Sequence, residues 1–141
     1  MLEQVFQIQD PTSLEALKAI LGDAKMVERI AATTDPYPSS TWEWEDGTVI
    51  WFEDYQSSGI TVETKAQEPI ATPLELTLNQ SSLDDSKGRF AGLKKSERNA
   101  EAPAVEVWKI QQGDTWYFLF FNKDKVLIRI KIAAVDLDAV G

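Results

Sequence analysis

The stretch that decides the fold reads VEVWKIQ (residues 105–111), then TWYFLFFN (115–122), then KVLIRIKIA (125–133). All three segments are rich in β-branched and aromatic residues, which favour strands. The breaks between them, Gln112-Gly113 and Lys123-Asp124, have the length and polarity of two-residue hairpin turns. The pattern therefore predicts three consecutive antiparallel strands.

Two-residue turns also determine which side chains share a face of this sheet. The predicted core face holds Trp108, Ile110, Tyr117, Leu119, Phe121, Val126, Ile128, Ile130 and Ile132. The opposite face would hold Lys109, Trp116, Phe118, Phe120, Leu127, Arg129 and Lys131. A solvated face should be mostly polar. Its aromatic residues therefore either lie under a further layer of the fold or form an exposed platform for a partner.

The first half of the chain has a similar plan. Leu14, Leu17, Ile20 and Leu21 recur at helical spacing, and Thr12 and Glu15 fit a capping box. Residues 26–31 favour a strand. A hairpin about Asp46-Gly47 would then place Trp42, Trp44, Val49 and Trp51 on one face and Glu43, Glu45, Thr48 and Ile50 on the other.

A second helix over 83–91 starts at Ser81-Ser82-Leu83-Asp84, which resembles Thr12-Ser13-Leu14-Glu15. We therefore expect a single α+β domain over residues 1–141, with an antiparallel sheet and helices on one face. Its two similar halves would span about 1–66 and 67–133, followed by a C-terminal tail at 134–141. Residues 66–73 are interpreted as the connector between the halves.

This plan resembles the tandem repeat of β-lactamase inhibitory protein and its relatives, which include small outer-membrane assembly lipoproteins. The resemblance rests on Leu14 to Gly22 followed by Trp42 to Gly47, and on Leu83 to Gly92 followed by Trp108 to Gly113. It implies helices on one face of the sheet and an open face available for protein contacts. The disulfides of the inhibitor have no counterpart here. A single α+β sheet without a repeat, as in secretion-chaperone-like or nuclear transport factor-like folds, is the alternative.

Composition excludes several classes of function. The chain has no Cys and no His, which removes thiolate catalysis, Ser-His triads and Cys or His metal sites. Its net charge of −9 repels nucleic acid, and none of its apolar runs reaches the ~20 residues of a membrane-spanning helix. We expect no cofactor and no metal. No secretory signal is visible at Met1-Leu2-Glu3, so the chain as written is expected to be cytoplasmic, or exported if a signal has been removed.

Three pairs of carboxylates are candidates for catalysis or metal binding, namely Asp84-Asp85, Glu43-x-Glu45 and Asp136-x-Asp138. Each pair also has a structural interpretation, as the first turn of a helix, an outward-facing hairpin and a C-terminal tail. No phosphate-binding glycine motif is present. We therefore expect no catalytic residues.

The leading hypothesis is a non-enzymatic protein-binding module, inhibitor-like or assembly-factor-like, that uses an open sheet face. The predicted partner-binding residues are Trp116, Phe118, Phe120, Lys109, Arg129, Lys131, Glu43 and Glu45. The alternative is a small-ligand-binding domain in which the same aromatics line an apolar pocket between the sheet and the helices. A homodimer is also considered, with the acidic first half of one copy against basic residues of another, namely Lys87, Arg89, Lys94, Lys95 and Arg98.

Overall fold

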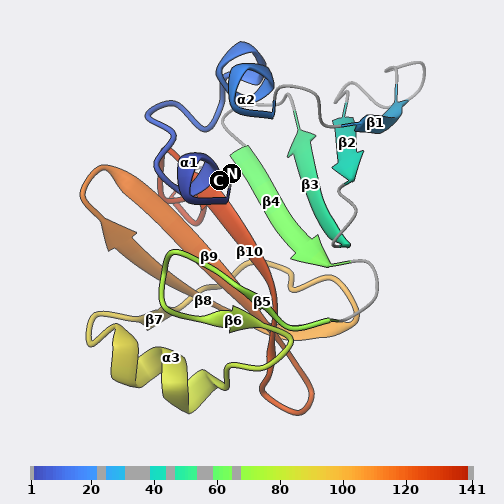
Figure 1. Cartoon of the computed structure of the whole chain (residues 1–141). Helices are drawn as coiled ribbons and strands as arrows, with labels where there is room; N and C mark the ends of the chain where they lie inside the picture. The colour runs from blue at the N-terminus through green and yellow to red at the C-terminus, as the bar shows by residue number, and fades with distance from the viewer. Residues whose placement is uncertain are drawn as a thin grey trace.

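The computed structural model describes residues 2–21, 25–30, 39–43, 47–53, 59–64 and 68–139. In this part of the chain, the main feature is an antiparallel sheet with strand order β1-β2-β3-β4-β10-β9-β8-β7 (Figure 1). Its first four strands are β1 (Lys25–Ile30), β2 (Ser39–Glu43), β3 (Thr48–Glu53) and β4 (Gly59–Thr64). The other four are β7 (Lys94–Lys95), β8 (Ala104–Gln112), β9 (Thr115–Asn122) and β10 (Leu127–Ala133). The predicted α+β class with an antiparallel sheet is confirmed.

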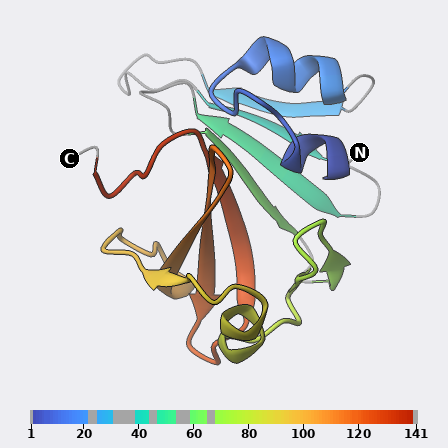
Figure 2. The same ribbon diagram turned by 90° about the vertical axis from the view of Figure 1, so that its left-hand side faces the viewer.

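The described residues also form three helices, α1 (Leu2–Phe6), α2 (Leu14–Leu21) and α3 (Leu83–Arg89). A small second sheet consists of β5 (Ile70–Ala71) and β6 (Thr77–Leu78), within and beyond the segment expected to be a connector. Figure 2 shows the helices and this small sheet on one side of the main sheet and the C-terminal segment on the other. We call these sides the helix face and the second face.

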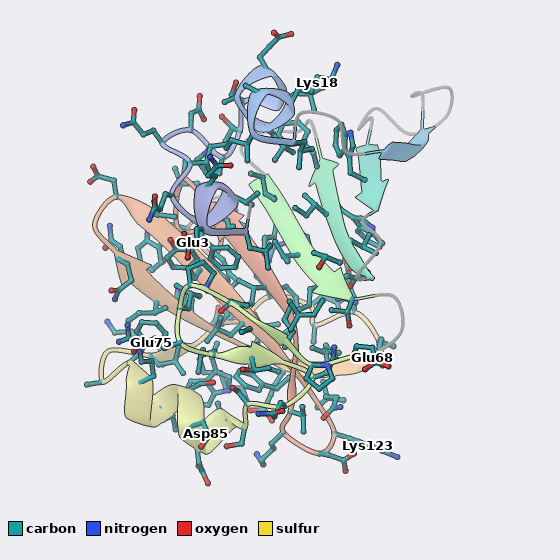
Figure 3. All side chains as sticks on the ribbon, viewed as in Figure 1. Glu3, Lys18, Glu68, Glu75, Asp85 and Lys123 are labelled. Carbon is teal, nitrogen blue, oxygen red and sulfur yellow. The ribbon has the colours of Figure 1, made fainter. Side chains whose placement is uncertain are left out.

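The largest core lies between the sheet and the elements on the helix face. Val5 and Phe6 of α1, Leu17 and Leu21 of α2, and Leu83 of α3 pack against buried strand residues. The Tyr117 hydroxyl donates a hydrogen bond of 2.9 Å to the Phe6 carbonyl oxygen, so α1 is attached to β9 by polar as well as apolar contact. Charged side chains such as Asp85 and Lys123 instead lie exposed at the periphery of the molecule (Figure 3).

Both predicted helices are present, and serine begins each of them. The Ser13 hydroxyl accepts a hydrogen bond from the Ala16 amide, one residue later than the predicted cap at Thr12. Ser82 and Asp85 form a complete capping box at α3, in which each side chain accepts from the other residue's backbone amide. Helix α3 ends at Arg89, two residues before the predicted end.

Strands β8 and β9 have the predicted faces, although their turn lies one residue later than the predicted Gln112-Gly113. Trp108 pairs with Leu119 and Ile110 with Tyr117, so the core-face assignment for this hairpin is correct. The turn itself consists of Gly113 and Asp114, since Gln112 pairs with Thr115.

The start of β10 differs from the prediction. Leu127 pairs with Phe121 and lies in the core on the helix face, whereas Ile128 packs on the second face. A register shift between Leu127 and Arg129 then returns Ile130 and Ile132 to the predicted face. The preceding turn explains the position of Leu127, because the Asn122 side chain accepts hydrogen bonds from the amides of Asp124 and Val126. This turn is longer than two residues, and the added residue reverses the alternation.

The hairpin of the first half is shifted by one residue from its predicted register. Trp42 pairs with Ile50 rather than with Trp51, and Glu43 pairs with Val49. Ile50 is fully buried in the core on the helix face. Trp51, the next residue in the strand, therefore lies on the second face. The predicted turn partner Asp46 lies outside the described residues, as do Trp44 and Glu45.

Candidate functional site

A second, smaller core covers the predicted binding face. Phe118 is fully buried and Phe120 is 5% exposed, so the expectation of exposed aromatics is wrong for both side chains. They share the face that the sequence predicted, but the chain itself covers them. The cluster around them contains Ala104, Val107, Ala133 and Leu137, with Ala100, Trp116 and Ile128 packed at its edge.

The cover consists of the loop before β8 and the C-terminal segment after β10, rather than helices. Ala100 belongs to the loop and Leu137 to the C-terminal segment, and Figure 2 shows both segments on the side of the sheet opposite α1. The aromatics therefore neither form an open platform nor line an apolar pocket between the sheet and the helices. They are buried beneath two chain segments that lack regular secondary structure.

An ion cluster holds the C-terminal segment in place. The Lys109 ammonium lies 2.8 Å from an Asp136 carboxylate oxygen and 2.7 Å from an Asp138 carboxylate oxygen. The Ser96 hydroxyl donates a 2.8 Å hydrogen bond to the other oxygen of Asp138. The Asp136-x-Asp138 pair thus has a defined partner in the fold, and Lys109 is occupied by its own chain.

Burial and pairing act in opposite directions on the ionisation of this cluster. Burial of the Lys109 ammonium lowers its pKa, but the hydrogen bonds and charges of Asp136 and Asp138 outweigh this and raise the pKa above its ordinary value. Burial raises the pKa of Asp138, but hydrogen bonds from Lys109 and Ser96 outweigh it and lower that pKa. Both shifts favour the charged pair.

The other predicted cations on this face lie against aromatic rings or carboxylates. Arg129 forms a 2.8 Å ion pair with Glu63 across β10 and β4, and its guanidinium is 5.4 Å from the centre of the Phe120 ring. Lys131 is buried, with 6% of its surface exposed. The predicted cations are thus built into the second face, where they pack beside the aromatics.

A groove of about 420 Å³ lies beside this ion pair. It is formed by the end of β4, the residue after β6, the loop before β8, and the β9–β10 turn with the start of β10. Its lining residues are Glu63, Thr64, Asn79, Pro103, Asn122, Val126, Ile128 and Arg129. Of the predicted site residues whose side chains the structure describes, only Arg129 lines this groove, because the turns that build it bring together segments far apart in the sequence.

A much smaller hollow, of about 50 Å³, shares Arg129 with the groove as a lining residue. Trp51, Arg98, Phe120 and Lys131 are among its lining residues. The sequence analysis placed Trp51 in the core, so its part in this site was missed. Apolar residues occupy both faces of β3, and the pattern carries no signal that favours the observed register. The Nε atom of Arg98 is buried here and has no hydrogen-bond partner among the described residues.

The remaining candidates are less informative. Glu43 lies in β2, but its side chain is outside the described part of the structure, as is all of Glu45. In the basic cluster, Arg89 forms an ion pair with Glu75, and the Lys87 ammonium is 4.6 Å from the centre of the Trp108 ring. Asp85 forms the helix cap described above, and hydrogen bonds from Ser82 lower its pKa. The roles of Glu43, Glu45 and the basic cluster in binding stay predictions.

Within the described ranges, no three acidic side chains come together as a metal site would require. No helix in the same ranges is long and apolar enough to cross a membrane. The chain matches no family model, no curated protein and no solved structure.

Proposed function

We propose that this chain is a non-enzymatic protein-binding module whose second sheet face makes the contact, centred on the groove beside Arg129. The observation that carries the proposal is the composition of that groove. Pro103, Val126 and Ile128 contribute apolar surface, the other five lining residues contribute amide, hydroxyl and charged groups, and the lining comes from separate chain segments. Mixed surfaces of this kind, with arginine packed on an aromatic ring, are typical of protein interfaces.

The position of Arg129 supports this proposal. Its stem and guanidinium are held by Glu63 on one side and by Phe120 below, so little side-chain freedom remains to be lost on binding. A partner that contacts the groove would meet a preorganised donor group. Such a group suits an inhibitor-like or assembly-factor-like contact, as the resemblance implies.

A small-ligand-binding domain remains the second candidate, and one observation favours it. The groove volume of about 420 Å³ falls within the range of roughly 300 to 1,000 Å³ that small-molecule pockets occupy. Such pockets are predominantly apolar, however, whereas five of the eight groove residues are polar or charged. We therefore rank the protein partner first.

The two-halves architecture is a further part of the proposal. Helix α2 followed by β1 to β4 has the same element order as α3 followed by β7 to β10. The sheet order is also symmetric about the β4–β10 pair, and Ser13 and Ser82 begin the two helices. These features favour a relation to the tandem-repeat inhibitors. An experimental structure whose halves do not superpose with Ser13 on Ser82 would refute it.

The binding proposal is tested with a matched pair of variants. Val126→Glu places a charge in the groove, whereas Val105→Glu places one at a side chain that is 58% exposed and is not a groove residue. Both variants and the original chain are immobilised, checked for native circular dichroism, and used to retain proteins from an extract of the source organism.

We expect the original chain and Val105→Glu to retain the same protein, and Val126→Glu to retain at least tenfold less of it. Equal retention by all three chains would rule out the groove as the contact. Native mass spectrometry of the freshly purified chain tests the alternative. A stoichiometric small molecule that is lost from Val126→Glu would favour the ligand-binding function instead.

A further inference from the structure

The C-terminal segment occupies a site that is built for two carboxylates with one aliphatic side chain between them. Lys109 binds both Asp136 and Asp138, and Ser96 donates to Asp138. Leu137, which lies between the two acids, is buried in the small core with Phe118 and Phe120. Three consecutive residues, Asp136 to Asp138, thus place two carboxylates in an ion cluster and one aliphatic side chain in an apolar slot.

The contacts that hold this segment are made mainly by three side chains, Asp136, Leu137 and Asp138. From 134 to 139, Leu137 is the one buried side chain, and Val135 is 36% exposed. Among the residues that the structure describes, the one backbone–backbone hydrogen bond of this segment outside the strands joins the Ala139 amide to the Asp136 carbonyl oxygen. The segment is therefore held mainly by its own side chains, and it adds no strand to the sheet.

We infer that this site recognises an acidic–aliphatic–acidic segment of a partner protein, and that residues 135–138 of the chain occupy it until the partner displaces them. The inference rests on the proposed protein-binding function of the second face, and it names the chemistry of the partner. The sequence Val-Asp-Leu-Asp acts as an internal substitute for the partner segment.

The requirement for acid follows from Lys109. Only 14% of this side chain is exposed while the segment is in place. A partner segment that covered Lys109 to the same extent without a carboxylate would leave a largely buried ammonium without a counter-charge. Such a state is unfavourable unless another carboxylate replaces the lost one. Exchange with a second acidic segment keeps Lys109 paired throughout, whereas exchange with an apolar or basic segment does not.

Arg98 provides a second donor for such a segment. Its guanidinium lies 5.8 Å from the centre of the Phe118 ring, next to the apolar slot, and its buried Nε has no hydrogen-bond partner in the described structure. Its backbone amide also bonds to the Ser96 hydroxyl that contacts Asp138. A partner carboxylate can therefore satisfy a donor that the chain's own segment leaves unused.

The test uses the labelled peptide AAVDLDA, which copies residues 133–139, and the full chain in three forms. In Asp136→Asn/Asp138→Asn the internal segment is weakened, and in the triple variant Lys109→Met is added. Peptide binding is measured by fluorescence polarisation, with AAVNLNA as the control peptide. Circular dichroism establishes that each chain is folded, and Leu137→Ser serves as a second weakened form if the double variant is not.

We expect the weakened chain to bind AAVDLDA at least tenfold more tightly than the original chain does. Binding should be lost with AAVNLNA and with the Lys109→Met triple variant. Equal, weak binding by all forms would overturn the inference and leave the segment a purely structural cover. Dimers of the original chain that disappear with Lys109→Met would also overturn it, in favour of exchange between two copies. Neither result affects the groove test, which depends on Val126.

Discussion

Replacing Phe118 by alanine tests whether the second face carries a true core. The ring is fully buried among Val107, Phe120, Ala133 and Leu137, and the Arg98 guanidinium lies 5.8 Å from its centre. The substitution removes most of a phenylalanine side chain and leaves a cavity beneath the C-terminal segment. It tests both the burial of this residue and the existence of the cover.

The expected cost follows from this environment. Loss of a fully buried phenylalanine destabilises proteins by about 3 to 5 kcal/mol. One wall of the cavity is a segment that is held mainly by three side chains and can move inward, so we expect the lower value of about 3 kcal/mol. For a domain of 141 residues this corresponds to a fall in Tm of about 10 °C.

Thermal unfolding followed by circular dichroism measures this fall. Val105→Ala is the matched control, since that side chain is 58% exposed and its loss should cost less than about 0.5 kcal/mol. If Phe118→Ala unfolds within about 2 °C of Val105→Ala, the ring is not buried. The second face would then have no such cover, and the exposed aromatic platform, one of the two interpretations of the sequence, would be favoured.

Two further predictions concern the sheet junction and the ion cluster. A Cβ at Gly59, where φ is +87°, would lie 2.0 Å from the Ile132 carbonyl oxygen, so Gly59→Ala should cost about 3 kcal/mol in chemical denaturation. Gly88→Ala, with open space around its Cβ in α3, should instead stabilise by about 0.5 to 1 kcal/mol. The lowered pKa of Asp138 means that its contribution is lost as the pH falls through that pKa, below the ordinary 3.8. The raised pKa of Lys109 means that its contribution is lost only as the pH rises above the ordinary 10.5. Methyl NMR shifts of Leu137 should therefore stay constant from pH 5 to about pH 10, and a change near neutral pH would contradict this assignment.

The sequence was most informative where the strands are long and regular. The faces of β8 and β9 were predicted correctly because residues 104–122 contain one tight turn, and a single turn fixes the alternation of the whole hairpin. At the start of β10 the same method failed, because the hydrogen bonds of the Asn122 side chain lengthen the turn. Alternation alone does not reveal such a bond.

In the first hairpin the failure has a different cause. Apolar residues occupy both faces of β3, since Val49, Ile50, Trp51 and Phe52 are consecutive. Either register therefore buries large side chains, and the pattern does not distinguish between them. Packing against α2 and the neighbouring strands selects Ile50 and Phe52 for the helix face.

The cover of the second face could be anticipated only in part. Aromatics on both faces of β9 indicated that something covers one of them, and this was one of the two interpretations considered. The identity of the cover depends on Lys109 pairing with Asp136 and Asp138, residues that follow it by more than twenty-five positions. In the sequence alone, nothing distinguishes Asp136 and Asp138 from the carboxylates of a solvent-exposed tail.

The central claim, that the second face binds a protein, is tested most directly by hydroxyl-radical footprinting of the chain alone and in complex with the retained partner. The account predicts that Pro103, Val126 and Ile128, which line the groove beside Arg129, lose reactivity in the complex. The residues of α2 and α3 on the helix face should keep theirs. Protection confined to those two helices, with the groove residues unchanged, would contradict it.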